Sequence, residues 1–289
     1  MSEQKKVLGV YGPAGSHWVG DGFPVRTLFP SYEVSDLSPF LMLDYAGPAY
    51  FEPANRPRGV EEHPHRGFET VTIAYQGTVD HRDSGGHSGT INPGDVQWMT
   101  AASGVVHEEM HGKEFTANGG NFEMVQLWVN LPAAYKMSKP RYQSILSDQI
   151  PGVNVGTGAF ARVIAGEQGG AKGPAKTFTP VNVFDVRLQS GARAELKLPA
   201  GQNSAIVLLR GDVVINGSSS LKGQARIAPL SATGEAVLLE AKEESILLIL
   251  SGEALNEPVA SYGPFVMNTQ AELRQAFDDY RAGRLGRLH

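Results

Sequence analysis

The chain has 289 residues, a formal net charge of −5 and no cysteine. The length is sufficient for two domains. The small acidic charge gives no electrostatic reason to expect direct nucleic-acid binding, and the lack of cysteine excludes disulfides, thiolate metal ligands and a cysteine nucleophile. Because no stretch approaches the roughly 20 apolar residues of a membrane span and the N-terminus lacks a signal-peptide core, we expect a cytoplasmic protein that contacts no membrane.

Short strands dominate the prediction for the first half of the chain. β-rich segments alternate with runs of Gly, Pro, Asn and Asp, such as residues 83–86 and 92–95, which are typical of turns. The last of these strands alternates strictly, so that Val125, Leu127 and Val129 share one face. The predicted strands span residues 71–75, 96–99, 105–110 and 122–131.

The second half resumes the same rhythm after a connection. Residues 132–175 are rich in Pro, Gly, Ser and Lys and are predicted to connect the halves, with a short strand at 160–164. Gly211-Asp212 and Asn216-Gly217 indicate turns. Further strands are predicted at residues 192–198, 205–209, 213–215, 236–239 and 246–250.

One helix is predicted near the C-terminus. Thr269 and Glu272 have the spacing of a capping box, and Gly283 is a plausible end for the helix. The apolar stripe at positions i, i+3, i+4 and i+7 consists of Leu273, Ala276, Phe277 and Tyr280.

Many short strands joined by turns favour antiparallel β-barrels over parallel βαβ units. The 34 glycines and 18 prolines, scattered along the whole chain, agree with this interpretation. We therefore predict an all-β protein with two jelly-roll barrels in tandem, at residues 1–135 and 136–289, followed by the short helix.

Six of the eight histidines fall between residues 63 and 111. His63 and His65 are two residues apart on an extended segment and so share one face. His107 and Glu109 have the same spacing. Two such strands folded together bring three imidazoles and one carboxylate to one point, which suits a divalent first-row metal with open coordination positions.

The sequence alone does not decide the roles of several other side chains near this cluster. Glu69 lies four residues after His65 and has the same strand parity, so either glutamate qualifies as the carboxylate ligand or as a partner that orients a ligand. His111 also shares the parity but is expected past the strand end. His81 and His87 flank a turn and are predicted to be structural, at most lining the pocket mouth. Trp128 is predicted to belong mostly to the core, and His17 and His289 to be exposed.

The segment from 63 to 111, which begins His63-Pro64-His65-Arg66-Gly67, strongly resembles the pirins, members of the cupin superfamily. The resemblance extends to residues 20–23, 39–44, 127–131 and 263–269, whereas between roughly 140 and 260 it is one of pattern and length only. The resemblance implies two cupin barrels with a C-terminal helix. It also implies one metal, usually iron as Fe(II), bound in the first barrel by His63, His65, His107 and Glu109, which favours Glu109 over Glu69. The second barrel, with no histidine between residues 112 and 288, is expected to bind no transition metal.

Two functions follow from the resemblance. Several pirins are similar to quercetin 2,3-dioxygenases, which open the central ring of a flavonol with O2 and release carbon monoxide. In that case Glu109, besides binding the metal, would be the catalytic base. The alternative is a non-catalytic protein whose metal or redox state controls binding to a transcription factor or a metabolic enzyme.

Overall fold

The computed structural model describes residues 3–13, 15–34 and 36–288, so His289 lies outside the described residues. The chain forms two compact units: unit 1 comprises Met1–Ala14, Thr27–Phe40 and Asp148–Ala254, and unit 2 comprises Gly15–Arg26, Leu41–Ser147 and Leu255–His289. The predicted domain bounds, 1–135 and 136–289, stay a prediction. The compact units differ from them by grouping the N-terminal segment with the later strands and the C-terminal segment with the earlier ones.

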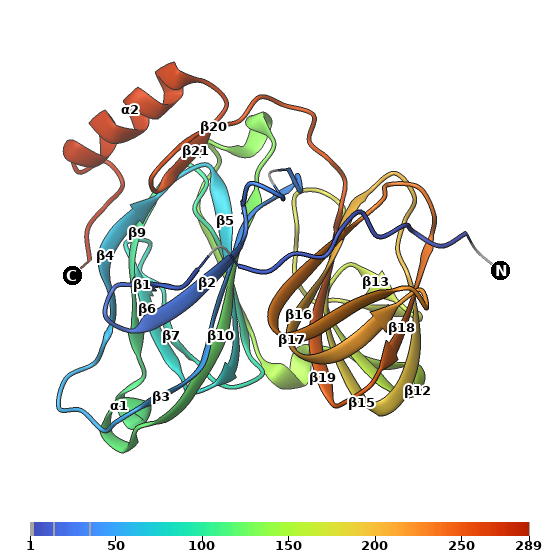
Figure 1. The fold of residues 1–289 in the computed structure, drawn as a ribbon. Helices are drawn as coiled ribbons and strands as arrows, with labels where there is room; N and C mark the ends of the chain where they lie inside the picture. The colour runs from blue at the N-terminus through green and yellow to red at the C-terminus, as the bar shows by residue number, and fades with distance from the viewer. Residues whose placement is uncertain (1–2, 14, 35, 289) are drawn as a thin grey trace. The chain divides into compact units, whose positions relative to one another are not determined.

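Unit 2 contains two facing sets of antiparallel strands (Figure 1). One sheet has the order β1-β2-β3-β10-β5-β8-β11, with part of β2 and the first residue of β3 assigned to unit 1, and the other has the order β4-β9-β6-β7. Aromatic and aliphatic side chains such as Phe23, Phe51 and Phe122 pack between them. The strands are β1 His17–Val19, β2 Phe23–Phe29, β3 Phe40–Phe51, β4 Gly59–His65, β5 Phe68–Gln76, β6 Val79–Asp83, β7 Ser88–Ile91, β8 Val96–Thr100, β9 Val105–His111, β10 Gly120–Asn130 and β11 Arg141–Ile145.

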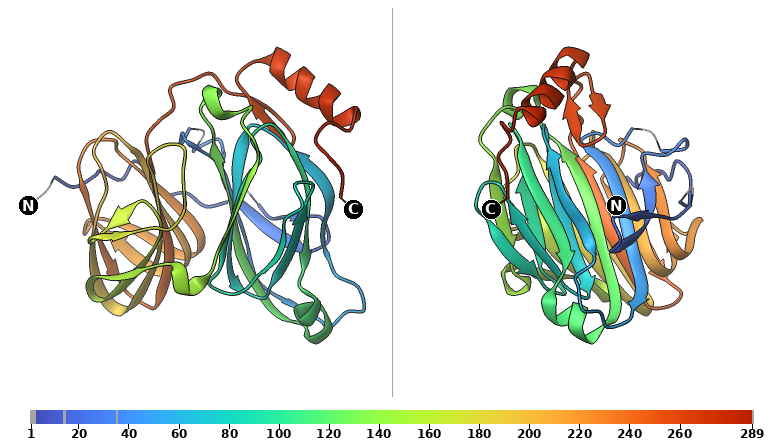
Figure 2. Two further views of the ribbon diagram at one scale, coloured as in Figure 1. Left: turned by 180° about the vertical axis from the view of Figure 1, so that it is seen from behind. Right: turned by 90° about the vertical axis from the view of Figure 1, so that its left-hand side faces the viewer.

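Short elements complete unit 2. A strand pair, β20 (Ala260–Tyr262) and β21 (Phe265–Met267), precedes helix α2 (Gln270–Arg281), and the helix lies beside this pair in every view (Figure 2). The other short elements are α1 (Lys113–Asn118) and the 3-10 turn Ala133–Tyr135.

Unit 1 is a second antiparallel barrel built around a large cluster of buried apolar side chains. Its strands are β12 Gly152–Ala165, β13 Glu167–Gln168, β14 Ala171–Lys172, β15 Val181–Lys197, β16 Asn203–Ile215, β17 Ser219–Leu230, β18 Ala236–Ala241 and β19 Ser245–Gly252, after the 3-10 turn Ser147–Gln149. The predicted connection at 132–175 therefore contains a 14-residue strand, β12. The two strands predicted at 205–209 and 213–215 form one strand, β16, because Gly211, at φ +125°, stays paired with Gly223 of β17 and makes no turn. The strand has a register shift against β19 between Leu208 and Arg210.

The all-β prediction and the C-terminal helix are confirmed. The helix begins with the predicted capping box: the Glu272 N–H donates to Thr269 Oγ1 (3.2 Å), and the Thr269 N–H donates to Glu272 Oε2 (2.8 Å). Its buried face differs from the predicted stripe, because Asp279 is buried whereas Tyr280 is exposed. None of the helices in the described part of the chain combines the length and apolar character that a membrane crossing needs.

The chain turns sharply between β4 and β5 at Gly67. Its φ is +89°, and a Cβ there would lie 1.9 Å from the Val266 carbonyl oxygen, so only glycine fits. Lys136 fastens the same place: its buried Nζ donates to Gly67 O (2.7 Å), Val266 O (3.0 Å) and Asn130 Oδ1 (2.5 Å). Burial lowers the pKa of Lys136 to about 8. At neutral pH the ammonium thus still has three protons for three acceptors.

Arg66, the residue before Gly67, connects the turn to α2. Its Nε donates to Ser103 O (2.7 Å) and its Nη1 donates to Asp279 Oδ2 (2.8 Å), with only 4% of the arginine and 12% of the aspartate side chain exposed. Arg284 and Gln275 also donate to this carboxylate. The hydrogen bond from Arg66 is the main cause that lowers the pKa of Asp279 to about 2.

We predict that Asp279→Asn lowers the free energy of unfolding by about 2–3 kcal/mol, somewhat less than the roughly 3–5 kcal/mol of a fully buried pair, because part of the carboxylate reaches solvent. Since folding depresses this pKa, the stabilisation is fully present above about pH 4 and is lost as the pH falls towards 2. Urea unfolding at several pH values measures it.

The matched control is Asp278→Asn, because Asp278 is 65% exposed and pairs with Arg281 on the solvent side of the same helix. Its effect should stay within about 0.5 kcal/mol. Equal losses for the two variants would contradict the account of α2 docking.

Candidate metal centre

Three histidine rings meet on the inner face of the β4-β9-β6-β7 sheet. His63 and His107 are cross-strand partners in the pairing of β4 with β9, and their ring centroids lie 4.3 Å apart. His65 lies 4.9 Å from each of them. One ring nitrogen of each histidine lies within 4.8 Å of the other two, so the three rings could hold one metal ion.

The other nitrogen of two of these rings is engaged by a backbone carbonyl. His63 Nδ1 lies 2.8 Å from Glu61 O, and His65 Nδ1 lies 3.4 Å from Pro264 O. Because a carbonyl oxygen can only accept, each Nδ1 carries the proton and each Nε2 presents a lone pair. This is the arrangement that orients imidazole ligands in metalloproteins.

His107 also has one ring nitrogen that is engaged and one without a partner. Its Nδ1 lies 3.4 Å from His81 Nδ1, whereas its Nε2 is fully buried and has no hydrogen-bond partner. A buried nitrogen without a partner is costly in a protein interior. A metal ion between the three Nε2 atoms would satisfy it, so the donor set fits such an ion.

Burial keeps two of the rings neutral. Desolvation, followed by the nearby His63, lowers the pKa of His65 to about 3. Desolvation is also the largest cause that holds the pKa of His107 well below its ordinary value, followed by the surrounding histidines. Neutral imidazole is the form that binds metals, so no proton has to be displaced at neutral pH.

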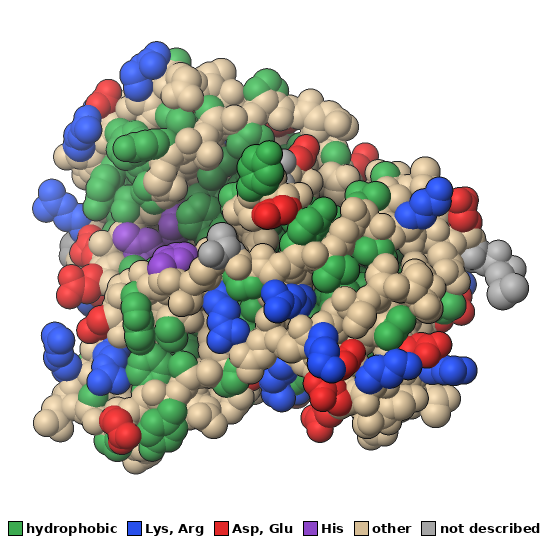
Figure 3. Space-filling model, in the orientation of Figure 1, with side chains coloured by type: hydrophobic (Ala, Val, Ile, Leu, Met, Phe, Trp, Pro, Cys, Tyr) green, Lys and Arg blue, Asp and Glu red, His purple; other side chains and the backbone are tan. Residues whose placement is uncertain are grey.

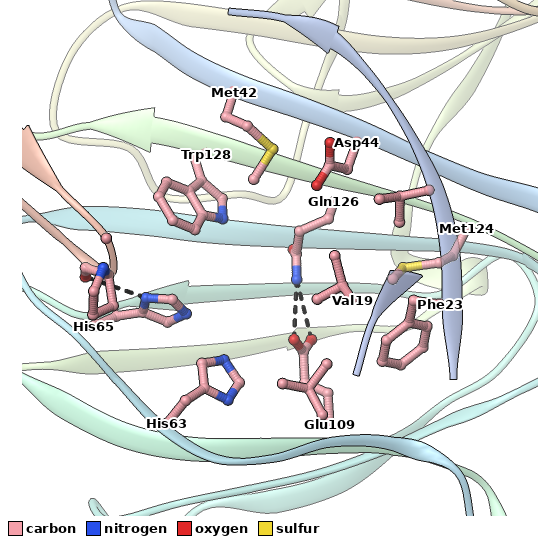
Figure 4. Close-up of a pocket in the computed structure, with 14 residues that line it drawn as sticks. Val19, Phe23, Met42, Asp44, His63, His65, Glu109, Met124, Gln126 and Trp128 are labelled. Atoms are coloured by element: carbon pink, nitrogen blue, oxygen red, sulfur yellow. Dashed lines mark hydrogen bonds between the residues drawn. The ribbon is translucent and has the colours of Figure 1, made fainter. Parts of the chain in front are cut away.

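Glu109 lies near the trio, on the same face of β9. Its Oε2 accepts from Gln126 Nε2 at 3.1 Å (Figure 4). Its Oε1 accepts from Thr72 Oγ1 at 3.1 Å. Its carboxylate does not join the group of ligand atoms that lie within 4.8 Å of one another. The structure thus shows Glu109 held by Gln126 and Thr72 at the edge of the cluster.

Glu69, the other carboxylate left open by the sequence, lies outside this cluster. The turn at Gly67 breaks the continuity between β4 and β5, so the parity that relates Glu69 to His65 does not hold. Glu69 accepts a hydrogen bond from Thr100 Oγ1 (2.6 Å) and lies 3.7 Å from Arg141 Nη2. Burial raises the pKa of Glu69 to about 7.

The cluster opens into an apolar cavity of about 320 Å3, a size typical of small-molecule sites. Figure 3 shows histidine side chains at the floor of a hollow bordered by hydrophobic side chains. In Figure 4, Trp128, Met42, Met124 and Phe23 surround the space above His63 and Glu109. The lining residues are Val19, Phe23, Val25, Met42, Asp44, Val60, His63, His65, Glu109, Met124, Gln126, Trp128, Gly263 and Pro264.

Several expectations for neighbouring residues change. Trp128 is a cavity wall instead of a core residue, with its ring 5.3 Å from that of His65. His111 is the last residue of β9, and its Nε2 donates to Gly22 O (2.9 Å) within an aromatic cluster. His81, predicted to be structural, is buried beside His107. Sequence reasoning missed Gln126 and Thr72, because nothing in an isolated strand shows which residue faces a carboxylate from another sheet.

Comparisons with known proteins agree with this geometry. The family models described as Pirin and as Pirin C-terminal cupin domain match residues 22–129 and 183–286. This chain belongs to the pirin family. Human Pirin is 39% identical over 99% of this chain and 96% of its own length. The predicted pair of cupin domains is thereby confirmed for this pirin.

Two relatives of this pirin carry enzyme names. The structure titled Quercetin 2,3-dioxygenase from Acinetobacter baumannii is 52% identical, with a TM-score of 0.95, over 99% of this chain and 100% of that chain. A Pseudomonas aeruginosa protein with the provisional name of a quercetin 2,3-dioxygenase is 54% identical over 99% of this chain and 100% of its own length.

We predict that His107→Ala lowers the affinity for Zn(II) by at least about 100-fold. Loss of a residue that only hydrogen-bonds to a metal ligand already costs up to about 100-fold, and loss of the ligand itself should cost no less. The variant removes one of three converging nitrogens and leaves two. Competition with a chromophoric chelator measures the affinity. His111→Ala, which removes a buried histidine from the same strand, should keep the wild-type affinity. An unchanged affinity in His107→Ala would contradict this description of the site.

Proposed function

We propose that this pirin holds one divalent metal ion, Fe(II), through His63, His65, His107 and Glu109. The support is the convergence of three lone pairs whose opposite nitrogens are already engaged. Glu109 would complete the set through one carboxylate oxygen, Oε1, while its Oε2 keeps the hydrogen bond from Gln126. Nitrogen and oxygen donors of this kind suit Fe(II) and leave coordination positions open.

We further propose that the metal centre catalyses the oxidative opening of a flavonol. The observation that carries this proposal is that His63 and His65 of the cluster line an apolar cavity with aromatic walls, which has the Glu109 carboxylate at its floor. The names of the Acinetobacter and Pseudomonas relatives point to the same reaction. In its balance, both atoms of O2 enter the products and the carbon that bears the hydroxyl leaves as carbon monoxide.

The residues of the cavity have separate tasks in this proposal. Trp128, Met42 and Phe23 pack against the flat rings of the substrate and exclude water. Glu109 accepts the proton of the flavonol hydroxyl, and the hydrogen bond from Gln126 keeps its carboxylate pointed at that proton. When bound, the metal ion supplies positive charge for the ionised substrate and the redox chemistry with O2.

We predict that the protein, loaded anaerobically with Fe(II) and then given quercetin and O2, consumes the flavonol absorption and releases one carbon monoxide per O2. Gln126→Leu should keep the wild-type iron content but lower kcat by about tenfold to 100-fold. The upper value is what a displacement of a catalytic group by about 1 Å costs. The reason is that Glu109 loses the amide that holds it.

Asp278→Asn, on the exposed side of α2, is the control and should leave kcat unchanged. Wild-type protein with one bound iron and no turnover would overturn the dioxygenase proposal. That result would favour the alternative in which the metal state controls binding to a transcription factor or a metabolic enzyme.

A further inference from the structure

His107 differs from the other two histidines of the cluster in what engages its Nδ1. His63 and His65 face backbone carbonyl oxygens, whereas His107 faces the ring nitrogen of another side chain, His81, at 3.4 Å. The two rings lie with their centroids 5.2 Å apart. His81 lies on β6 and His107 on β9, and these two strands pair directly. Both rings are buried on the inner face of the sheet.

The two nitrogens that face each other cannot both carry a proton. If Nε2 of His107 presents its lone pair to the centre of the cluster, its proton lies on Nδ1 and must be donated to His81 Nδ1. His81 Nδ1 is then a bare acceptor. A proton on the His81 ring is therefore on Nε2.

The surroundings of His81 Nε2 favour a proton there. His81 Nε2 is buried without a hydrogen-bond partner, but Asp83 Oδ2 lies 3.6 Å from it, which is longer than a hydrogen bond and still close for a buried charge. Only 2% of the Asp83 side chain is exposed, and His81 is fully buried. A buried negative charge at this distance stabilises the N–H form of the facing nitrogen.

Asp83 and the His81 ring are themselves fixed. The Gly85 N–H (2.8 Å) and the His87 N–H (3.1 Å) donate to Asp83 Oδ1, and His87 Nδ1 lies 3.1 Å from both carboxylate oxygens. The ring of His81 stacks on Tyr142 at 5.3 Å between centroids, and His87 stacks on the same tyrosine at 5.2 Å. This packing prevents the His81 ring from turning away from His107.

We propose that His81, held by Asp83, is a positioning residue that fixes His107 in its Nδ1-protonated form and makes it the most electron-rich ligand of the metal centre. The inference rests on the metal centre proposed above. An imidazole nitrogen is a stronger acceptor than an amide carbonyl, so it draws the Nδ1 proton further from His107. The greater electron density at Nε2 binds a cation more tightly and favours the higher oxidation state of iron.

The test compares two substitutions of His81. His81→Asn keeps an acceptor oxygen close to the place of Nδ1, whereas His81→Leu, of similar size, has none. Asp83 is left in place in both variants. The diamagnetic ion Zn(II) is the probe, because it allows ring-nitrogen NMR on the loaded protein.

In wild-type protein with Zn(II), nitrogen-15 spectra should show His81 protonated on Nε2 and His107 on Nδ1, with the His107 N–H protected from exchange with solvent. His81→Leu should lose this protection, lose about tenfold to 100-fold in Zn(II) affinity, and shift the Fe(III)/Fe(II) potential to more positive values. His81→Asn should restore most of all three.

Three results would overturn the inference, and they are distinguishable. If Zn(II) binds but His81 carries its proton on Nδ1, the proposed orientation is wrong even though the metal centre stands. If His81→Leu keeps the wild-type affinity and His107 signal, His81 does not act through His107. If wild-type protein binds no Zn(II), the metal centre itself is wrong and the inference falls with it. Should His81→Leu fail to fold, the wild-type spectrum and His81→Asn still decide.

Discussion

The cross-strand pairing of His63 with His107 is the constraint on which the rest of the centre depends. In an antiparallel ladder, a slip of one residue would send one of the two rings to the opposite face of the sheet. His65 follows His63 by two residues on β4, and Glu109 follows His107 by two residues on β9, so both lie on the same inner face. The pairing of β4 with β9 therefore brings the cluster together, and the remaining contacts fix the orientation of its side chains.

The C-terminal segment supplies several of the contacts that orient the cluster. The Pro264 carbonyl engages His65 across 199 residues of sequence, and Arg66 and Lys136 fasten the turn at Gly67 to α2 and β21. Val106 packs with Phe265 and Leu273 in one apolar cluster. A residue near the C-terminus, Pro264, thus orients the His65 ring in the first barrel. This dependence explains why residues 255–289 belong to the same compact unit as the histidines.

Sequence patterns correctly predicted features that depend on a few neighbouring residues of one strand or one helix end. The two-residue spacings of His63 with His65 and of His107 with Glu109 predicted shared faces, and the capping box predicted the start of α2. The same parity argument was wrong for Glu69, because one glycine with positive φ separates the two strands involved. Parity holds only along an uninterrupted strand.

What the sequence could not show are contacts between strands and across the sheets. His81 has its role only because β6 pairs with β9, and Gln126 only because β10 faces that sheet. The burial of Asp279 in place of Tyr280 depends on Arg66, more than 200 residues earlier. The second half of β12 was predicted as the strand at 160–164, but its first half was missed because it is glycine-rich and looks like a linker, while its partner β15 lies elsewhere in the sequence.

X-ray absorption of the protein loaded with one equivalent of Zn(II) tests the central claim most directly. The account predicts a signal from three imidazole ligands at about 2.0–2.1 Å, reduced to two in His63→Ala. A coordination shell with fewer than three imidazoles in the wild-type protein, or a shell unchanged in His63→Ala, would contradict it.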